Sequence, residues 1–403
     1  MTATDPIARP AAFGHPAKAL WPLAPDLLYL NHGTVGVTPK KVLAVQQQIL
    51  GDIEREPSRY LLRELSPHQM GSKLPEPRLR TAAAEVAAFV RARPEEVVFV
   101  DNVTTAANGV LRSFPFAAGD EALVSDLGYG AVTFTARHAT GLRGATVRVV
   151  EMPFPIRDPQ QVVDAYANAV GPRTRLAIVD HITSSSALVL PVKEIVAALH
   201  ARGVAVMIDG AHAPAQLDLD VPSIGADWYV ANLHKWACAP RSCGFLWTPP
   251  ERQDGLHPAV ISWGYGQGYV AEFDHWGTRD PSPFLAAPAG LAFLRELGLE
   301  AMRKHQHELA WESGRILQSK WGTSIDTPRS MTAAMFTAPL PERAGSTEAD
   351  AQRIRDALLD EERIEVQMHA WRGRLWARVC AQVYVEAADV ERLAEAVLKR
   401  IPA

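Results

Sequence analysis

Lys235 and Asp209 have sequence neighbours that suit a role in covalent catalysis. Lys235 is flanked by His234 and Trp236 rather than by other charges, whereas most lysines are solvated at the surface. Asp209 ends an apolar run, and open α/β sheets place their sites at the carboxyl ends of strands. A lysine can hold an aldehyde as an imine, and a carboxylate can keep a pyridine nitrogen protonated. The pair predicts a pyridoxal phosphate enzyme, although either residue alone could be a turn cap or a surface charge.

A second segment could bind the phosphate of such a cofactor. Residues 101–108 directly follow a predicted strand and open a helical pattern. Backbone N–H groups at a helix N-terminus, together with the hydroxyls of Thr104 and Thr105, form a natural anion site. The competing interpretation is an ordinary Asp/Asn/Thr helix cap. Nucleotide binding is disfavoured because the chain has no GxxxxGK[ST] loop and no suitably placed GxGxxG.

The elements that must position these residues alternate between β-branched runs and amphipathic helices. This alternation predicts a large three-layer α/β domain with a mainly parallel sheet, whose strands are buried on both faces. Long helices and then short strands follow residue 286, which predicts a smaller C-terminal α+β domain. We therefore expect an arm over residues 1–25, a large domain over 26–285 and a small domain over 286–403. The expected strands are Glu96–Val100, Ala122–Ser125, Thr146–Val150, Leu176–Asp180, Val204–Asp209, Trp228–Ala231, Met331–Thr337, Val366–His369 and Leu375–Val385.

Composition narrows the class of protein. The formal net charge of the 403 residues is -4, which gives no reason to expect a nucleic-acid or anionic-membrane partner. Three cysteines without CxxC spacing suit a reducing compartment, and no metal site is predicted. The N-terminal residues lack the apolar core of a secretory signal, and no apolar run approaches the ~18 residues of a membrane span. We expect a cytoplasmic protein.

Five motifs, in this order, resemble the class V aminotransferase-type pyridoxal phosphate enzymes of fold type I. The opening segment 29–36 is most similar to the isopenicillin N epimerase-like branch, and the resemblance spans about Leu28 to Leu398. The motifs are Asn102-Val103-Thr104-Thr105, Asp209-Gly210-Ala211-His212, Asn232-Leu233-His234-Lys235-Trp236, Trp276-Gly277-Thr278-Arg279-Asp280 and Arg378-Val379-Cys380-Ala381-Gln382-Val383-Tyr384.

The resemblance implies roles for residues around the cofactor. Lys235 matches the Schiff-base lysine and the proton shuttle at the substrate Cα. Asp209 matches the partner of the pyridinium nitrogen, and His212 matches the residue that bonds the phenolic oxygen of the ring. Tyr129 falls where the family stacks an aromatic side chain on the ring. The expected cofactor contacts near the phosphate or in adjoining loops are Thr104, Thr105, Ser184, Asn232 and His234.

Further roles concern the substrate and a second subunit. Arg378 matches the arginine that binds the substrate carboxylate, and a guanidinium offers a planar fork for that purpose. Asn31 and His32 lie where the family's N-terminal loop lines the substrate pocket. Thr278 matches a phosphate ligand donated by the neighbouring subunit, which implies a homodimer with shared active sites. The loop at residues 180–187 departs from the family pattern, which leaves its geometry and the substrate choice open.

The same cofactor residues serve several reactions at the α-carbon of an amino acid. We expect an isopenicillin N epimerase-like epimerase or racemase first, and a carbon–sulfur lyase or class V aminotransferase as the alternative. Epimerisation needs an acid opposite Lys235, for which Tyr129, His32 and Tyr265 are the candidates. A desulfurase is disfavoured because residues 318–337 contain no cysteine. A regulator without catalysis is disfavoured because the imine-forming lysine and its acid are both retained.

Overall fold

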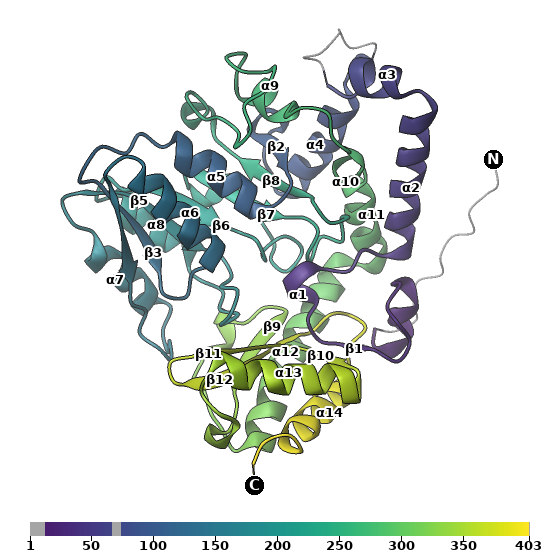
Figure 1. The fold of residues 1–403 in the computed structure, drawn as a ribbon, viewed down its shortest axis with the longest axis vertical. Coiled ribbons are helices and arrows are strands. Elements are labelled where there is room, and N and C mark those ends of the chain that lie inside the picture. The colour runs from purple at the N-terminus through teal and green to yellow at the C-terminus, as the bar shows by residue number, and fades with distance from the viewer. Residues whose placement is uncertain (1–12, 67–73, 403) are drawn as a thin grey trace.

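A central sheet with helices on both faces carries most of the residues that the sequence singles out (Figure 1). The structure is a computed structural model that describes residues 13–66 and 74–402. The strand order is β2-β8-β7-β6-β5-β3-β4; β8 runs antiparallel to β2 and β7, and the pairs from β7 to β4 are parallel. The strands are β2 (Val97–Val100), β3 (Glu121–Ser125), β4 (Thr146–Val150), β5 (Thr174–Asp180), β6 (Ala205–Asp209), β7 (Trp228–Asn232) and β8 (Gly244–Trp247).

Alternation along the strands builds two apolar cores, one on each face of the sheet. In β6, Val206 and Ile208 belong to one core and Met207 to the other, as the two-residue period of a strand requires. The predicted α/β class with a mainly parallel sheet is thereby confirmed. Helices α5 and α6 cover one face and α4, α7 and α8 the other. These helices are α4 (Arg78–Phe89), α5 (Val103–Ser113), α6 (Gly130–Gly141), α7 (Gln160–Ala169) and α8 (Val192–His200).

Two details of the sheet differ from the sequence expectation. Strand β4 was expected to be buried on both faces, and this is wrong: Thr146, Arg148 and Val149 are exposed because β4 is an edge strand that pairs with β3 alone. Strand β8 was not expected. It is short and antiparallel, and it lies between β2 and β7 with all of its residues buried.

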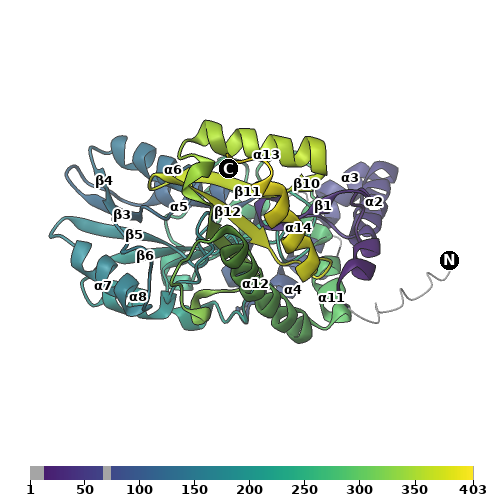
Figure 2. The same ribbon diagram turned by 90° about the horizontal axis from the view of Figure 1, so that it is seen from below.

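A three-stranded antiparallel sheet of order β11-β12-β9 forms the C-terminal part with helices α12, α13 and α14 (Figure 2). Strand β12 ends at Cys380, earlier than the expected Val385. Helix α11 packs on α2 and α4, whereas α12 packs on β9 and α14. The elements are α11 (Ala287–Leu297), α12 (Leu299–Trp321), β9 (Met335–Pro339), α13 (Glu348–Glu362), β10 (Ile364–Glu365), β11 (Gln367–Trp371), β12 (Arg374–Cys380) and α14 (Ala387–Leu398).

The N-terminal segment is tied to this C-terminal part. Strand β1 pairs in parallel with β10, and the Gly14 N–H donates to the Val383 carbonyl at 2.7 Å. The expected arm is thus a packed 3-10 turn over His15–Leu20, and its first twelve residues lie outside the described chain. No helix of the described residues is long and apolar enough to cross a membrane. The remaining elements are β1 (Leu28–Tyr29), α1 (His32–Val35), α2 (Lys40–Arg55), α3 (Pro57–Arg59), a π-helical turn (Tyr60–Glu64), α9 (Tyr269–Asp274) and α10 (Ser282–Leu285).

Candidate active site

A pocket of about 530 Å³ lies where the carboxyl ends of β5, β6 and β7 meet the start of α5. Parallel strands end at one edge of a sheet, so residues far apart in the sequence meet there. The pocket brings together most of the predicted cofactor residues. Those that line it are Thr104, Thr105, Tyr129, Ser184, Asp209, His212, Asn232, His234 and Lys235.

Lys235 follows β7 and its amine reaches the edge of the pocket. Its Nζ lies 3.2 Å from Nε2 of His212. Burial, and then the positive charge of Arg378, lower the pKa of Lys235 to about 8. The neutral amine that attacks an aldehyde is therefore far more populated near neutral pH than in an ordinary lysine, although the protonated form still predominates there.

Asp209 and His212 each keep one hydrogen-bonding atom that has no partner among the residues the structure describes. Oδ1 of Asp209 accepts from the Ala211 N–H at 3.0 Å, whereas its buried Oδ2 has no partner. Burial raises the pKa of Asp209 to about 6. Nε2 of His212 faces the Lys235 amine, so Nδ1 is left as the donor, and it too is buried without a partner. An acceptor and a donor of this kind fit the pyridinium N–H and the phenolic oxygen of pyridoxal phosphate.

The first turn of α5 forms the opposite end of the pocket. Asn102 caps the helix by accepting from the Thr105 N–H at 3.0 Å, and Oδ1 of Asn232 accepts from the Val103 N–H at 3.0 Å. His234 donates from Nδ1 to the Cys243 carbonyl at 3.0 Å, which fixes its ring beside the pocket. The helix N-terminus and the nearby Thr104 side chain suit a phosphate group. Of the cap residues, Asn102 was not singled out by sequence reasoning.

Arg378 lies behind the pocket wall on β12 and is 2% exposed. Its Nη1 donates to the Ser184 carbonyl at 2.5 Å, and its Nη2 donates to the Thr34 hydroxyl at 2.7 Å. Its Nε has no partner, and no carboxylate forms an ion pair with it within the part of the chain described. A buried guanidinium without a counter-charge favours an incoming carboxylate. Ser184, expected at the cofactor, uses its backbone to hold this arginine.

Asn31 and His32 support the site from behind rather than lining the pocket. Nδ2 of Asn31 donates to Glu365 at 2.8 Å, and Oδ1 of Asn31 accepts from Thr34 and from Arg378. The His32 ring is fully buried: it donates from Nε2 to the Lys235 carbonyl at 3.0 Å and accepts at Nδ1 from the Tyr384 hydroxyl. Burial lowers the pKa of His32 to about 4. His32 therefore positions the Lys235 backbone, in place of the expected substrate contact.

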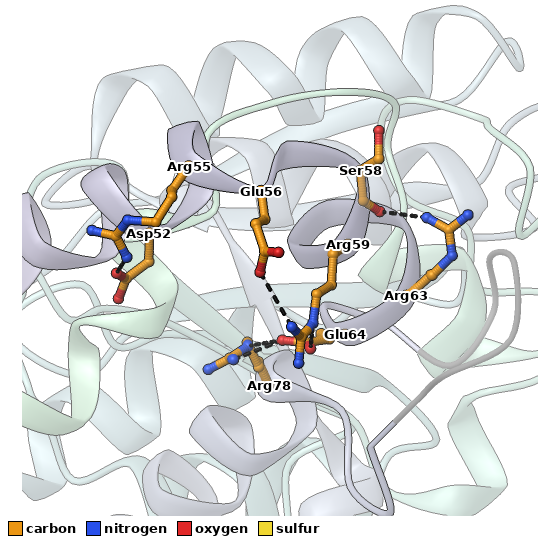
Figure 3. Close-up of polar contacts among 8 residues, drawn as sticks. All are labelled: Asp52, Arg55, Glu56, Ser58, Arg59, Arg63, Glu64 and Arg78. Carbon is orange, nitrogen blue, oxygen red and sulfur yellow. Dashed lines mark hydrogen bonds and ion pairs between the residues drawn. The ribbon is translucent and has the colours of Figure 1, made fainter.

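Thr278 lies outside this pocket, in a second groove of about 620 Å³ that Leu61 and Trp263 also line. One wall of the groove is formed by the π-helical turn, which a charge network holds in place (Figure 3). In this charge network, the Glu64 carboxylate accepts hydrogen bonds from Arg59 at 2.7 Å and from Arg78 at 2.7 Å. Thr278 is therefore not among the residues that line the candidate cofactor pocket.

Two charged residues of the pocket were not predicted as site residues. Asp180 ends β5 beside Asp209, and Arg241 lies near the mouth next to His234. Asp180 carries a signal that sequence reasoning could have used, because it ends an apolar strand just as Asp209 does. Arg241 stands in a loop and has no such signal. Tyr265, one candidate for the second acid, packs against His257 and does not line the pocket.

Comparison with known proteins gives close agreement over nearly the whole chain. The profile of the family described as aminotransferase class-V matches residues 29–393. A probable L-cysteine desulfhydrase, chloroplastic, of Arabidopsis thaliana is 34% identical over 401 residues, covering 93% of this chain and 82% of the relative. Isopenicillin N epimerase of Streptomyces clavuligerus is 32% identical over 393 residues, covering 93% of this chain and 95% of the relative. Because the first relative is named as chloroplastic, a cytoplasmic location stays a prediction.

Solved structures confirm the predicted fold type I architecture. A mutant of C-DES with glycine linked covalently to its PLP cofactor has a TM-score of 0.79 at 20% identity and covers 94% of this chain and 98% of its own. The apo cysteine desulfurase of Thermococcus onnurineus has a TM-score of 0.76 at 18% identity, covering 96% and 98%. At such identities the likeness concerns the fold alone.

Proposed function

The chain belongs to the aminotransferase class-V family and is a pyridoxal 5'-phosphate enzyme, and from this premise we propose that it is a carbon–sulfur lyase. Its substrate would be L-cysteine or a related amino acid with sulfur on Cβ. The proposal reverses the order expected from the sequence, which put epimerisation first. The relatives named above include a desulfhydrase and an epimerase, so the choice between the two reactions rests on the residues of the pocket.

The residues present fit the cofactor. Lys235 would hold its aldehyde carbon, and the free Oδ2 of Asp209 would accept from the ring nitrogen. Nδ1 of His212 would donate to the phenolic oxygen, and the first turn of α5 would receive the phosphate. When bound, the cofactor supplies an electron sink that makes the substrate Cα proton acidic.

The observation that carries the proposal is that, among the residues the structure describes, none of the three candidates for the acid opposite Lys235 is clearly placed for that role. Of the three candidates, His32 is buried with both ring nitrogens engaged, and Tyr265 is not part of the lining. Tyr129 lines the pocket but stands where a ring-stacking side chain is expected. Elimination needs one residue that handles protons at Cα, and Lys235 can serve alone.

In the proposed reaction, Lys235 takes the proton from Cα and the Cβ–S bond breaks, with its electron pair leaving on sulfur. The products from L-cysteine and one water are sulfide, pyruvate and ammonia, so atoms balance without an oxidant or reductant. Arg378 would hold the substrate carboxylate during this step. Transfer of the sulfur to a protein cysteine is disfavoured because Cys238, Cys243 and Cys380 are all buried.

Epimerisation is the second candidate, and the position of Tyr129 favours it. Its side chain is 47% exposed and lines the pocket, so its hydroxyl could deliver a proton to Cα. One experiment separates the two reactions: the purified holoenzyme is incubated with L-cysteine and other amino acids in deuterated water. Sulfide and pyruvate in equal amounts would support the lyase. Exchange of the α-proton with loss of enantiopurity, and no keto acid, would make it an epimerase.

The expected homodimer is part of the same proposal. Thr278 lies in a groove separate from the pocket, and apolar Leu61, Leu62 and Trp263 line that groove. A second copy that covers the groove could bring Thr278 to its partner's phosphate site. Light scattering of the holoenzyme tests this point, and a monomer with full activity would exclude it.

A further inference from the structure

Asp180 and Asp209 end neighbouring parallel strands and stand directly beside each other. They are Cα partners in the register of β5 and β6, and neighbouring strands lie about 4.8 Å apart. Both side chains are buried, at 4% and 2% exposure, and both line the pocket. Two ionised carboxylates so close together and away from water repel each other strongly, so such a pair keeps one proton.

The surroundings decide which carboxyl keeps that proton. Asp209 lies near the positive charge of Lys235, which favours its ionised form. Tyr229, buried beside Asp209 on β7, bonds His181 through its hydroxyl at 2.8 Å and brings no charge.

Asp180 has no comparable cation. Across from it lie the buried Tyr166 of α7, the backbone of Tyr129 at the start of α6, and Gly128. Among the residues described, none forms an ion pair with Asp180. Burial first, and then the charge of Asp209, raise the pKa of Asp180 well above its ordinary value.

We propose that Asp180 holds the shared proton in the working enzyme, so that Asp209 alone carries the negative charge that faces the ring nitrogen. The inference rests on the proposed function in one respect: it takes the negative charge of Asp209 to hold the ring nitrogen of bound pyridoxal phosphate. Asp180 then acts through Asp209 as a positioning residue. As a neutral carboxylic acid, it keeps Asp209 ionised without adding a second charge to the site.

Infrared spectroscopy tests the protonation state directly. The holoenzyme is expected to show the C=O band of a protonated carboxyl, which shifts in D2O and persists at neutral pH, where ordinary carboxyls are ionised. Asp180→Asn should remove the band. The control Asp126→Asn should leave it, because Asp126 forms an ion pair with Arg372 at 2.7 Å. No band in the wild type, or a band that Asp180→Asn leaves in place, would overturn the proposal.

A second measurement separates a charge effect from a folding effect. Asp180→Asn replaces a neutral acid with a neutral amide, so we expect the ring nitrogen of 15N-labelled pyridoxal phosphate to stay protonated and activity to fall less than about tenfold. Loss of ring protonation in folded Asp180→Asn would mean that Asp180 is ionised and would overturn the proposal. Should that variant not fold, the pH titration of the wild-type band still decides, and its loss in the acidic range where ordinary carboxyls ionise is the negative result.

The test also stands apart from the proposed function. The apoprotein contains the same carboxyl pair, and we expect the band there as well. A protein that shows the band but binds no cofactor would contradict the proposed function and leave the protonation of Asp180 established. A protein that binds the cofactor but shows no such band would contradict the protonation of Asp180 and leave the proposed function standing.

Discussion

Nη2 of Arg378 donates a hydrogen bond to the hydroxyl of Thr34 at 2.7 Å, and this bond joins the small antiparallel sheet to the short helix α1. The two residues come from opposite ends of the chain, and Thr34 lines the pocket that Lys235 enters. The parallel pairing of β1 with β10 holds the two ends together, and Asn31 bonds Glu365 of β10 at 2.8 Å. The proposed carboxylate site therefore depends on how the N-terminal segment docks.

Replacing Arg378 tests its role as the carboxylate site. Arg378→Lys keeps the charge and removes the planar fork, so we expect KM for L-cysteine to rise by about 10- to 100-fold, with a smaller effect on kcat. Steady-state kinetics of sulfide release measure both constants. Arg329→Lys, at an exposed arginine, is the control and should change neither. A fall in kcat at unchanged KM would assign Arg378 a different role.

Removing the amine of Lys235 should remove both the covalent link and the base. For Lys235→Ala we expect a fall in activity of at least about 10²- to 10⁴-fold. Protein treated with borohydride and digested should no longer carry cofactor on the peptide around residue 235. Lys193→Ala, at an exposed lysine, is the matched control. A labelled peptide that persists in Lys235→Ala would place the link on another lysine.

The pKa of Lys235 makes cofactor capture by the apoprotein depend on pH. Burial, and then Arg378, lower this pKa to about 8, so the reactive neutral amine increases as pH rises through about 8 and is nearly complete above it. We expect the rate of capture to follow that curve and level off. Stopped-flow absorbance with a limiting amount of pyridoxal phosphate measures it. A rate that still climbs steeply near the ordinary lysine pKa of about 10.4 would show that the amine is not perturbed.

The sequence predicts the sheet well because strands and caps follow from local patterns, whereas the roles of the ring-facing residues come from the family resemblance and stay predictions. Strand β6 ends at Asp209 as expected, and the cap at the start of α5 is visible in the residue types. Burial at the edge of a sheet is not a local property: Val149 of β4 has the residue type of a core position, yet it is exposed because β4 lies at the sheet edge.

Contacts between distant segments escape sequence reasoning for the same reason. His32 was expected to touch substrate, and its place under the Lys235 carbonyl depends on how α1 packs against the segment after β7. The charge state of Asp180 depends on the register between β5 and β6, which no run of residues reveals.

A buried ion pair between Arg80 and Asp274 should contribute strongly to stability at neutral pH. The atoms Nη1 and Oδ1 lie 2.9 Å apart, and the side chains are 9% and 0% exposed. Arg80→Met would leave the buried Asp274 carboxylate without its paired cation, and we expect the free energy of unfolding to fall by about 3–5 kcal/mol. Arg295→Met removes an exposed pair with Glu85 and should change it by less than about 1 kcal/mol.

The loss in Arg80→Met should depend on pH in a defined direction. Burial already raises the pKa of Asp274 to about 6 with Arg80 present, and removal of the cation raises it further. A folded pKa above the unfolded value means that protonation favours the fold, so relative to the wild type the variant recovers stability as pH falls from its own raised pKa to about 6. Urea unfolding of both proteins at about pH 7.5 and pH 5 should give the larger difference at the higher pH. An equal difference at both values would mean that lost packing of Arg80, and not the stranded carboxylate, accounts for the effect.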